Sequence, residues 1–471
     1  MEPLRAAGPT RARIAAWLTR RLGGRERVKV VAALASVMAL DGADKGAVGA
    51  MAVSLQHAFG VGKTEIGLLL TVSLGMGAIA TLPFGWLVDR VNRTRLLSWA
   101  VVVWGLAMAL SALATSYLFL LLSRVALGGV TACAAPGVAS LLGDYIPRPQ
   151  RASVYGTVLA GEFLGTGLGL LLCGELGAWS WRLGFLVLVL PAFALAWGLR
   201  RLREPERGAN DREDPGDAQA ASTVQALARK RGIAPRTDRL IDVDPRKQSV
   251  WWAAAYVLKV PTIVVMIVAS ALAYFFLSGI RTFGVLYLHD RYGLPETTAA
   301  ALAVLLGAGA LVGVIGSGRF ADRRIRKGDL RARVWVSAVA YLITCGLLLA
   351  ALLVPGLWPG MLLLAATATA LGGVNPPLDA ARLDVMPPWL WGRAESIRIV
   401  LREAGEAVAP LIFGWLADGA IGSVRGAFLV MLVPLALGGL IGLIALRTYP
   451  RDVATAAENT RRADRWIWPA G

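Results

Sequence analysis

Apolar stretches long enough to cross a lipid bilayer recur along almost the whole chain. A helix of roughly 20 apolar residues spans a hydrocarbon core of about 30 Å. We therefore expect an all-α polytopic membrane protein with twelve membrane helices, at residues 28–53, 65–87, 95–115, 117–143, 152–175, 183–203, 261–288, 297–320, 333–354, 358–380, 394–417 and 426–447.

The composition argues against a soluble protein and against several functions. Only 17% of the 471 residues are charged, below the roughly 25% that is typical of soluble domains. The net charge of +18 is spread over many short loops, so it forms no patch for nucleic acid. Cys133, Cys173 and Cys345 lie within apolar stretches, so we expect no disulfide and no metal site.

Basic residues alternate between the two sides of the predicted membrane segments. One set of loops carries most of them, and the other has only Lys63, Arg182, Arg291 and Arg425. Loops rich in Lys and Arg stay in the cytoplasm. We expect both termini to be cytoplasmic and the protein to lie in the inner (plasma) membrane.

The chain divides at a polar segment between the sixth and seventh predicted helices. This segment is rich in Arg, Asp, Pro and Gln, which offer little to build a core. The predicted organisation is a cytoplasmic tail at 1–27, a six-helix half at 28–203, a cytoplasmic linker at 204–249, a second six-helix half at 250–447 and a cytoplasmic tail at 448–471. Residues 251–259 read either as an interfacial segment or as the start of the seventh helix.

Three short motifs occur at corresponding points of both halves. The pairs are Gly85–Arg90 with Gly318–Arg323, Asp144–Pro147 with Asp384–Pro387, and Ala160-Gly161-Glu162 with Ala404-Gly405-Glu406. Parallel six-helix repeats of this kind are a known architecture of secondary transporters.

The loop Gly85–Leu97 (GWLVDRVNRTRLL) resembles the signature loop of the major facilitator superfamily. This resemblance implies a secondary transporter working by alternating access, and not an enzyme. It also implies that the loop latches one conformation, since a carboxylate is favoured at a helix N-terminus and can hold a basic partner. The latch residues would be Gly85, Asp89, Arg90, Gly318, Asp322 and Arg323.

Within that superfamily, the first half is most similar to the Spinster-type branch, whose members move lysophospholipids and sphingoid lipids. The similar segments are Asp44-Lys45, Gln56–Val61, Ser123-Arg124, Gly165–Gly169 and Glu204–Gly208. This similarity implies a lysolipid as substrate.

Ionisable residues in the first predicted helix mark a candidate pathway. A charge at bilayer depth costs roughly 2.5–3.5 kcal/mol and usually faces a wet cavity. Asp41 and Lys45 are four residues apart and can pair, so the two charges could simply offset each other. In the functional interpretation, Lys45 holds an anionic group, Asp41 contributes to the substrate site, and Asp44 carries a proton.

The fifth and eleventh predicted helices carry the repeated glutamates Glu162 and Glu406. Desolvation favours the protonated form of a carboxylate, so these two and Glu403 are candidates for proton coupling. Glu403 and Glu406 could instead serve only to neutralise Arg402 and Arg398. Arg124 and Arg281 complete the candidate substrate site, although both lie toward the outer ends of their helices, where long side chains can reach the interface.

The sequence predicts proton-coupled transport of an amphipathic or anionic small molecule such as a lysophospholipid. The alternatives are a multidrug/proton antiporter and a transporter of organic anions or sugar phosphates. A membrane enzyme would need a catalytic constellation, which we do not find, and the linker suggests no signalling domain for a receptor. We expect no cofactor beyond a proton gradient, the lipid bilayer and the substrate as partners, and a monomer.

Overall fold

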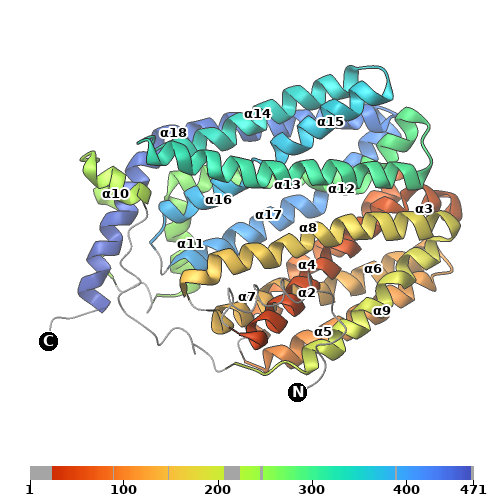
Figure 1. Ribbon diagram of the computed structural model, residues 1–471, viewed down its shortest axis with the longest axis horizontal. Coiled ribbons are helices and arrows are strands. Elements are labelled where there is room, and N and C mark those ends of the chain that lie inside the picture. The colour runs from red at the N-terminus through yellow and green to blue at the C-terminus, as the bar shows by residue number, and fades with distance from the viewer. Residues whose placement is uncertain are drawn as a thin grey trace, which may run out of the picture. The chain divides into compact units, whose positions relative to one another are not determined.

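The computed structural model describes residues 24–88, 90–146, 148–205, 223–243, 248–387 and 390–467. Within these ranges every regular element is a helix (Figure 1). The all-α class is therefore confirmed.

The chain forms two compact units, defined by the described residues of Met1–Met51 with Ile79–Pro215 and of Ala52–Ala78 with Gly216–Gly471. The helices of the first unit are α2 (Arg25–Ala50), α5 (Arg93–Ala112), α6 (Tyr117–Thr131), α7 (Ala134–Tyr145), α8 (Arg148–Trp179) and α9 (Trp181–Arg200). The second unit contains α3 (Ala52–Phe59), α10 (Thr223–Lys230), η2 (Thr237–Arg239), α11 (Val250–Lys259), α12 (Pro261–Tyr292), α13 (Glu296–Arg326), α14 (Ala332–Leu353), α15 (Leu357–Gly372), α16 (Asn375–Asp384), α17 (Trp391–Trp415), η5 (Leu416–Ala420) and α18 (Val424–Ile467). Helix α4 (Lys63–Val88) begins in the second unit and ends in the first.

In the described part of the chain, nine helices are long and apolar enough to cross a membrane. The predicted spans 28–53, 152–175 and 394–417 are not among these nine. They coincide with α2, α8 and α17, helices of 26, 32 and 25 residues. Each has the length to span a bilayer, and each carries ionisable residues that lower its hydropathy.

Two predicted spans are each divided into two helices. Residues 117–143 form α6 and α7, which meet at Ala132-Cys133. Residues 358–380 form α15 and α16, with Gly373-Val374 between them. Pro376 and Pro377 follow in the first turn of α16, where a missing backbone N–H costs nothing.

Residues 251–259 form most of α11, a helix distinct from α12. At its start, the Ser249 hydroxyl accepts a hydrogen bond from the Trp252 amide, which satisfies a backbone donor that has no partner within the helix. Pro261 begins α12 directly after Val260, and the residue before a proline avoids the helical conformation. The separation of the two helices follows from that proline.

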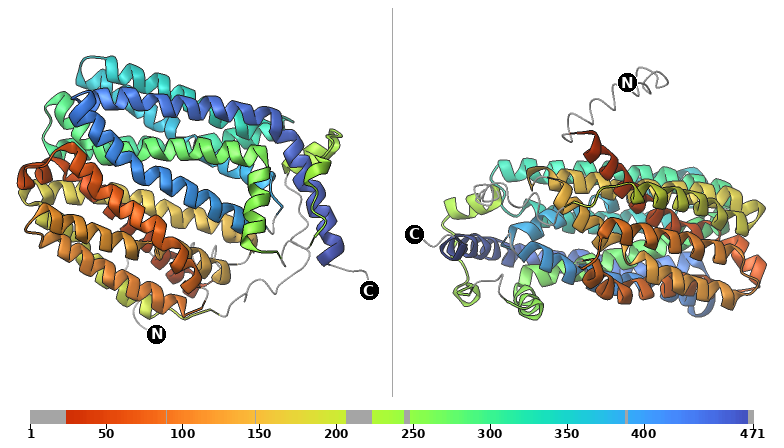
Figure 2. Two further views of the ribbon diagram at one scale, coloured as in Figure 1. Left: turned by 180° about the vertical axis from the view of Figure 1, so that it is seen from behind. Right: turned by 90° about the horizontal axis from the view of Figure 1, so that it is seen from below.

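The last helix continues past residue 447 as far as Ile467, and part of the predicted linker packs against its end. Figure 2 shows this helix from a second side. Val224 and Ala228 of α10 and Ile241 are buried in the core that contains Val453 of α18. The linker was expected to offer little for a core, but α10 places its few apolar residues on one face.

Ion pairs and hydrogen bonds fasten the same linker segment to α18. Arg236 Nε lies 3.0 Å from Asp452 Oδ1, and the Ile241 amide donates to Asn459 Oδ1 over 2.9 Å. Asn459 also donates to the Tyr256 hydroxyl of α11. Burial raises the pKa of Tyr256 to about 12, so this phenol stays protonated at neutral pH.

Small residues let α2 and α8 approach closely in the first unit. A Cβ atom added to Gly165 would lie 1.9 Å from the Ala39 carbonyl oxygen, and one added to Gly169 would lie 2.5 Å from Ala43 Cα. Such distances are far below van der Waals contact, so only glycine fits there. The glycines of Gly165–Gly169 therefore hold α2 and α8 in register and position the charges on both helices.

Candidate functional site

Lys45 of α2 lies between two carboxylates in the first unit. Its Nζ atom is 2.6 Å from Asp41 Oδ2 and 3.3 Å from Glu162 Oε1 of α8. The side chains are only partly exposed, at 26% for Lys45, 12% for Asp41 and 22% for Glu162. The first two pair as the four-residue spacing predicts, and Glu162 gains a basic partner that lies on another helix.

A second ion pair of the same unit is almost completely buried. Arg124 Nη1 of α6 donates to Asp44 Oδ1 over 2.9 Å, with 2% and 7% of the two side chains exposed. The guanidinium also lies 4.9 Å from the centre of the Phe185 ring. Arg124 was expected in the substrate site, with reach to the membrane interface as the alternative; its buried partner Asp44 holds it inside the unit.

The second unit holds a cluster around Glu406 of α17. Its Oε1 atom lies 3.0 Å from Arg281 Nη1 of α12, and its Oε2 atom lies 3.9 Å from Arg402 Nε. Arg402 also stacks over the Tyr274 ring at 4.3 Å and lies 3.8 Å from Glu403. Arg281, like Arg124, pairs inside its unit and does not extend to the membrane interface.

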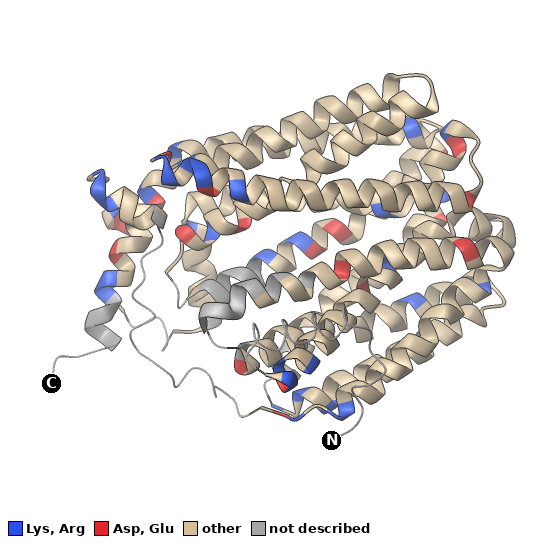
Figure 3. Ribbon diagram, in the orientation of Figure 1, with Lys and Arg blue, Asp and Glu red and all other residues tan. Residues whose placement is uncertain are grey.

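Asp379 of α16 joins this second cluster and was missed from the sequence. It lies 3.3 Å from Arg382 and 3.9 Å from Arg398, so Arg398 has an acidic partner on another helix. Asp379 could have been found from the sequence, because it is an acidic residue inside the predicted span 358–380. Figure 3 shows Lys and Arg beside Asp and Glu in the middle of α17, whereas many other helices carry charges mainly near their ends.

The repeated loops lie at the ends of α4 and α13. Asp322 Oδ1 accepts from Arg333 Nη2 over 3.1 Å, and Arg333 also pairs with Asp384, which accepts from the Tyr449 hydroxyl. Gly318 has room for a Cβ, 3.8 Å from Pro376 Cβ. Arg323 is exposed, so the cation that pairs with Asp322 is Arg333, a residue outside the repeated motif.

The corresponding loop of the first unit is described only in part. Asp89 lies outside the described residues, Gly85 lies within α4, and Arg90 is an exposed turn residue. Arg93 takes the position that Arg333 has in the second unit: it pairs with Asp144 and, over 2.7 Å, with Glu204. The repeated aspartates Asp144 and Asp384 thus each hold an arginine at the start of a helix, α5 in the first unit and α14 in the second.

The family is settled by a match over most of the chain. Residues 34–377 match the model of the Major Facilitator Superfamily. The protein belongs to this superfamily. It is accordingly a multi-pass membrane protein of a transporter family, as the signature loop predicted.

Curated relatives are similar over different shares of the chain. A probable chloroplastic anion transporter 3 of Arabidopsis thaliana is 35% identical over 31% of this chain and 29% of its own length. The sphingosine-1-phosphate transporter SPNS2 of Danio rerio is 31% identical over 40% of this chain and 39% of its own length. A D-galactonate transporter of Escherichia coli is 23% identical over 84% of this chain and 90% of its own length. The chain thus matches under a third of the length of the first of these relatives.

Solved structures show the same fold. A bacterial homolog of the human lysosomal transporter Spinster, in an inward-facing and occupied conformation, superposes with a TM-score of 0.72 at 19% identity. That comparison covers 90% of this chain and 98% of the homolog. At this identity the structure shows the fold alone, and the resemblance to Spinster-type transporters drawn from the first half is supported in sequence by SPNS2.

Proposed function

We propose that this superfamily member is a proton-coupled transporter that works by alternating access and moves an amphipathic anion such as a lysophospholipid. The observation that carries the proposal is the position of Lys45 between Asp41 and Glu162, inside the predicted spans of α2 and α8. Such groups cost roughly 2.5–3.5 kcal/mol each at bilayer depth and mark pathways.

We assign different tasks to the two clusters because their charge balances differ. In the first unit, two carboxylates contact one ammonium group, so these three side chains together carry one negative charge in excess when ionised. A single proton on Glu162 or Asp41 would neutralise them, and in a low-dielectric site neutralisation is favourable. We assign proton coupling to this cluster, with Glu162 as the leading carrier.

The second unit has the opposite balance. Among the described residues, four arginines lie against three carboxylates, so the cluster has one positive charge in excess when ionised. The residues are Arg281, Arg382, Arg398 and Arg402 with Asp379, Glu403 and Glu406. Guanidinium groups bind phosphate and carboxylate through paired hydrogen bonds. We assign the anionic group of the substrate to Arg281 and its neighbours, and to Lys45 once Glu162 is protonated.

The buried Asp44–Arg124 pair has a different proposed role. Because only 7% and 2% of these side chains are exposed, a substrate cannot reach them without a local rearrangement. We therefore propose that the pair holds α2 against α6, and that Glu162, rather than Asp44, exchanges the proton.

A lipid-like anion suits these sites best. Charged residues are few among predominantly apolar helices, and a lysophospholipid combines one phosphate with an acyl chain. SPNS2, by its name, transports sphingosine-1-phosphate, which has the same chemical character. The arrangement of basic loops further supports cytoplasmic termini in the inner or plasma membrane.

Transport of a small organic anion is the second candidate. It is favoured by the similarity to a probable anion transporter and to a D-galactonate transporter. Both substrates would use the same cations, and they differ in whether an acyl chain must be accommodated.

The test uses proteoliposomes with labelled lysophosphatidylethanolamine, galactonate and a cationic dye in parallel. We expect lysolipid movement that is lost in Lys45→Ala and kept in Lys29→Ala, because Lys29 lies on the same helix but 65% exposed beside Glu26. Movement of galactonate alone would support the organic-anion candidate. Movement of the dye alone would contradict both and indicate a drug antiporter.

A further inference from the structure

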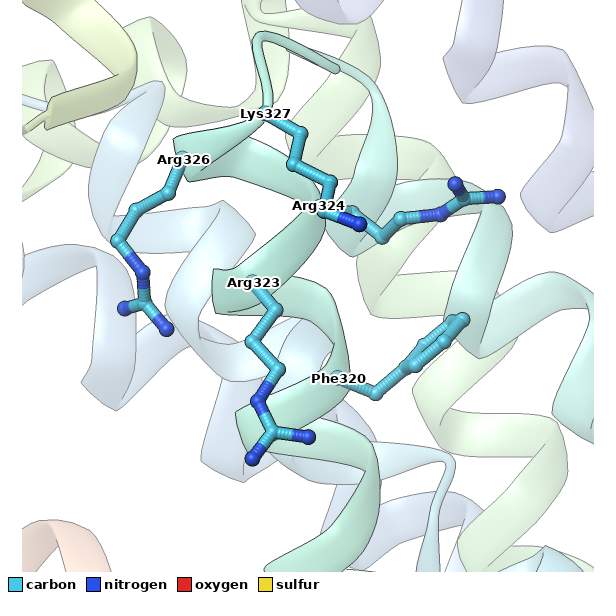
Figure 4. Close-up of a pocket in the computed structure, with 5 residues that line it drawn as sticks. All are labelled: Phe320, Arg323, Arg324, Arg326 and Lys327. Carbon is cyan, nitrogen blue, oxygen red and sulfur yellow. The ribbon is translucent and has the colours of Figure 1, made fainter.

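The end of α13 carries an open cleft of about 670 Å³ lined by one aromatic and four basic side chains. The residues are Phe320, Arg323, Arg324, Arg326 and Lys327. Figure 4 shows these side chains spread around the last turns of the helix, with Arg324 and Phe320 on the same side. None of the five residues belongs to the clusters around Lys45 and Glu406, although Asp322, which pairs with Arg333, lies on the same turns of α13.

The four cations lack acidic partners within the described part of the chain. The nearest carboxylates in sequence are engaged elsewhere: Asp322 pairs with Arg333, and Asp329 accepts from the Trp335 indole over 2.9 Å and from the Arg331 amide over 3.1 Å. Arg323 and Lys327, the residue directly after α13, are four residues apart, a spacing at which like charges on a helix repel. The helix dipole favours cations at the C-terminal end of α13, but it amounts to only about half a negative charge and cannot balance four cations.

Two aromatic rings lie beside the basic side chains of the cleft. Phe320 contacts Trp335 of α14 edge-on at 5.9 Å, and Arg324 lies 5.7 Å and 5.6 Å from the centres of these two rings. Tryptophan is enriched where membrane meets water, and Trp335 is the ring that meets this description. The helix that ends here is one of the nine in the described ranges that can cross a bilayer.

An apolar face continues from Trp335 along α14. Val339 and Ile343 follow at four-residue steps and are 37% and 49% exposed. Residues at this spacing lie on one face of a helix, so the rings of the cleft and this face form one continuous surface. An exposed apolar face on a membrane helix can contact acyl chains.

We propose that this cleft binds the phosphate of an anionic phospholipid. Arg324 and Lys327, with Arg323 and Arg326 beside them, contact the phosphate, and an acyl chain lies along Trp335, Val339 and Ile343. A free phosphate would use only the cations. A lipid uses the cations, the rings and the apolar face together, and for this reason we choose it. The site is independent of the transported substrate.

The test measures retention of phosphatidylglycerol by the full-length protein, using native mass spectrometry after reconstitution with phosphatidylcholine and phosphatidylglycerol. We expect wild type to retain phosphatidylglycerol selectively. Arg324→Gln/Lys327→Gln should bind this lipid about tenfold more weakly, since each basic residue near the surface adds attraction for anionic lipid. The control Arg200→Gln/Arg201→Gln removes the same charge at the end of α9, where the two arginines stack on Trp99 and Trp197, and should weaken retention much less, because these arginines do not line the cleft.

Two further measurements separate the possible outcomes. Melting temperatures in pure phosphatidylcholine show whether each variant is folded, and Phe320→Ala, which leaves all four cations, should also weaken retention. Equal retention by wild type and Arg324→Gln/Lys327→Gln would overturn the proposal. A stabilisation by glycerol phosphate equal to that by phosphatidylglycerol would overturn the assignment to a lipid.

Discussion

The Glu162 carboxylate lies 3.3 Å from the Lys45 ammonium group, and its counterpart in the second repeat, Glu406, lies 3.0 Å from the Arg281 guanidinium. Each pair joins helices that correspond in the two repeats, α2 with α8 and α12 with α17. The repeated Ala-Gly-Glu motif therefore places a carboxylate against a cation on the neighbouring helix in both units. The exposure differs, since 22% of the Glu162 side chain but only 7% of Glu406 is exposed.

Replacing Glu406 with Gln should destabilise the protein strongly. Removing one partner of a buried ion pair leaves uncompensated charge, here on Arg281 and Arg402, at a cost of about 3 kcal/mol. Glu403→Gln is the matched control on the same helix, because Glu403 is 26% exposed and lies 3.8 Å from Arg402. Thermal unfolding in detergent should show a clear decrease in melting temperature for Glu406→Gln only, and equal decreases would contradict this account of the cluster.

Gly165→Ala should disrupt the contact between α2 and α8. Its new methyl group would lie 1.9 Å from the Ala39 carbonyl oxygen, and overpacking of this kind costs about 1–3 kcal/mol or more. Gly198→Ala on α9 meets no atom within 4 Å and should leave the melting temperature unchanged or slightly higher, because alanine favours helices. A Gly165→Ala protein as stable as wild type would show that α2 and α8 can move apart to accommodate the methyl group without loss of stability.

The Asp44–Arg124 pair should show strong energetic coupling. We expect Asp44→Asn and Arg124→Gln each to lower the melting temperature, since each leaves a buried charge unpaired. The double variant should cost less than the sum of the two single variants, with a coupling of about 1–3 kcal/mol. Additive effects in this cycle would argue that the two side chains do not interact.

Glu204 should make part of the stability depend on pH. Burial acts to raise the pKa of Glu204, but hydrogen bonds from the Arg93 side chain and from the Thr94 and Arg93 amides outweigh burial and lower it. Because the folded state lowers this pKa, the contribution to stability is present above the ordinary value of 4.5 and is lost as the pH falls below it.

Comparison of Glu204→Gln with wild type measures this contribution. The difference in melting temperature should be largest near neutral pH, corresponding to about 1–2 kcal/mol, and should shrink as the pH falls through about 4. A difference that stays constant down to low pH would mean that Glu204 acts through packing and not through its charge.

The helical class and the family could be predicted because both depend on local patterns. Hydropathy identified the nine helices that can cross a membrane in the described part of the chain, and the Gly-x-x-x-Asp-Arg loop identified the superfamily. The pairing of Asp41 with Lys45 could also be predicted, since it lies within one helix. The partners of Glu162 and Asp322 could not, because Lys45 and Arg333 are brought near by contacts between helices that no local spacing encodes.

The packing of the linker could not be predicted either, because it also depends on contacts between segments that are distant in the sequence. Its composition is that of a disordered segment, and the apolar residues of α10 and Ile241 become a core only against α18. The end of α18 was likewise underestimated, because residues beyond 447 are less apolar and their burial depends on the linker.

The most direct test of the central claim is the pH dependence of transport by Glu162→Gln in proteoliposomes. Glu175→Gln is the control, since Glu175 is an exposed carboxylate on the same helix. The account predicts that an imposed proton gradient stimulates substrate movement in wild type and Glu175→Gln, whereas Glu162→Gln moves substrate at a rate that the gradient no longer changes. Stimulation of Glu162→Gln equal to that of wild type would contradict the assignment of proton coupling to the Asp41–Lys45–Glu162 cluster.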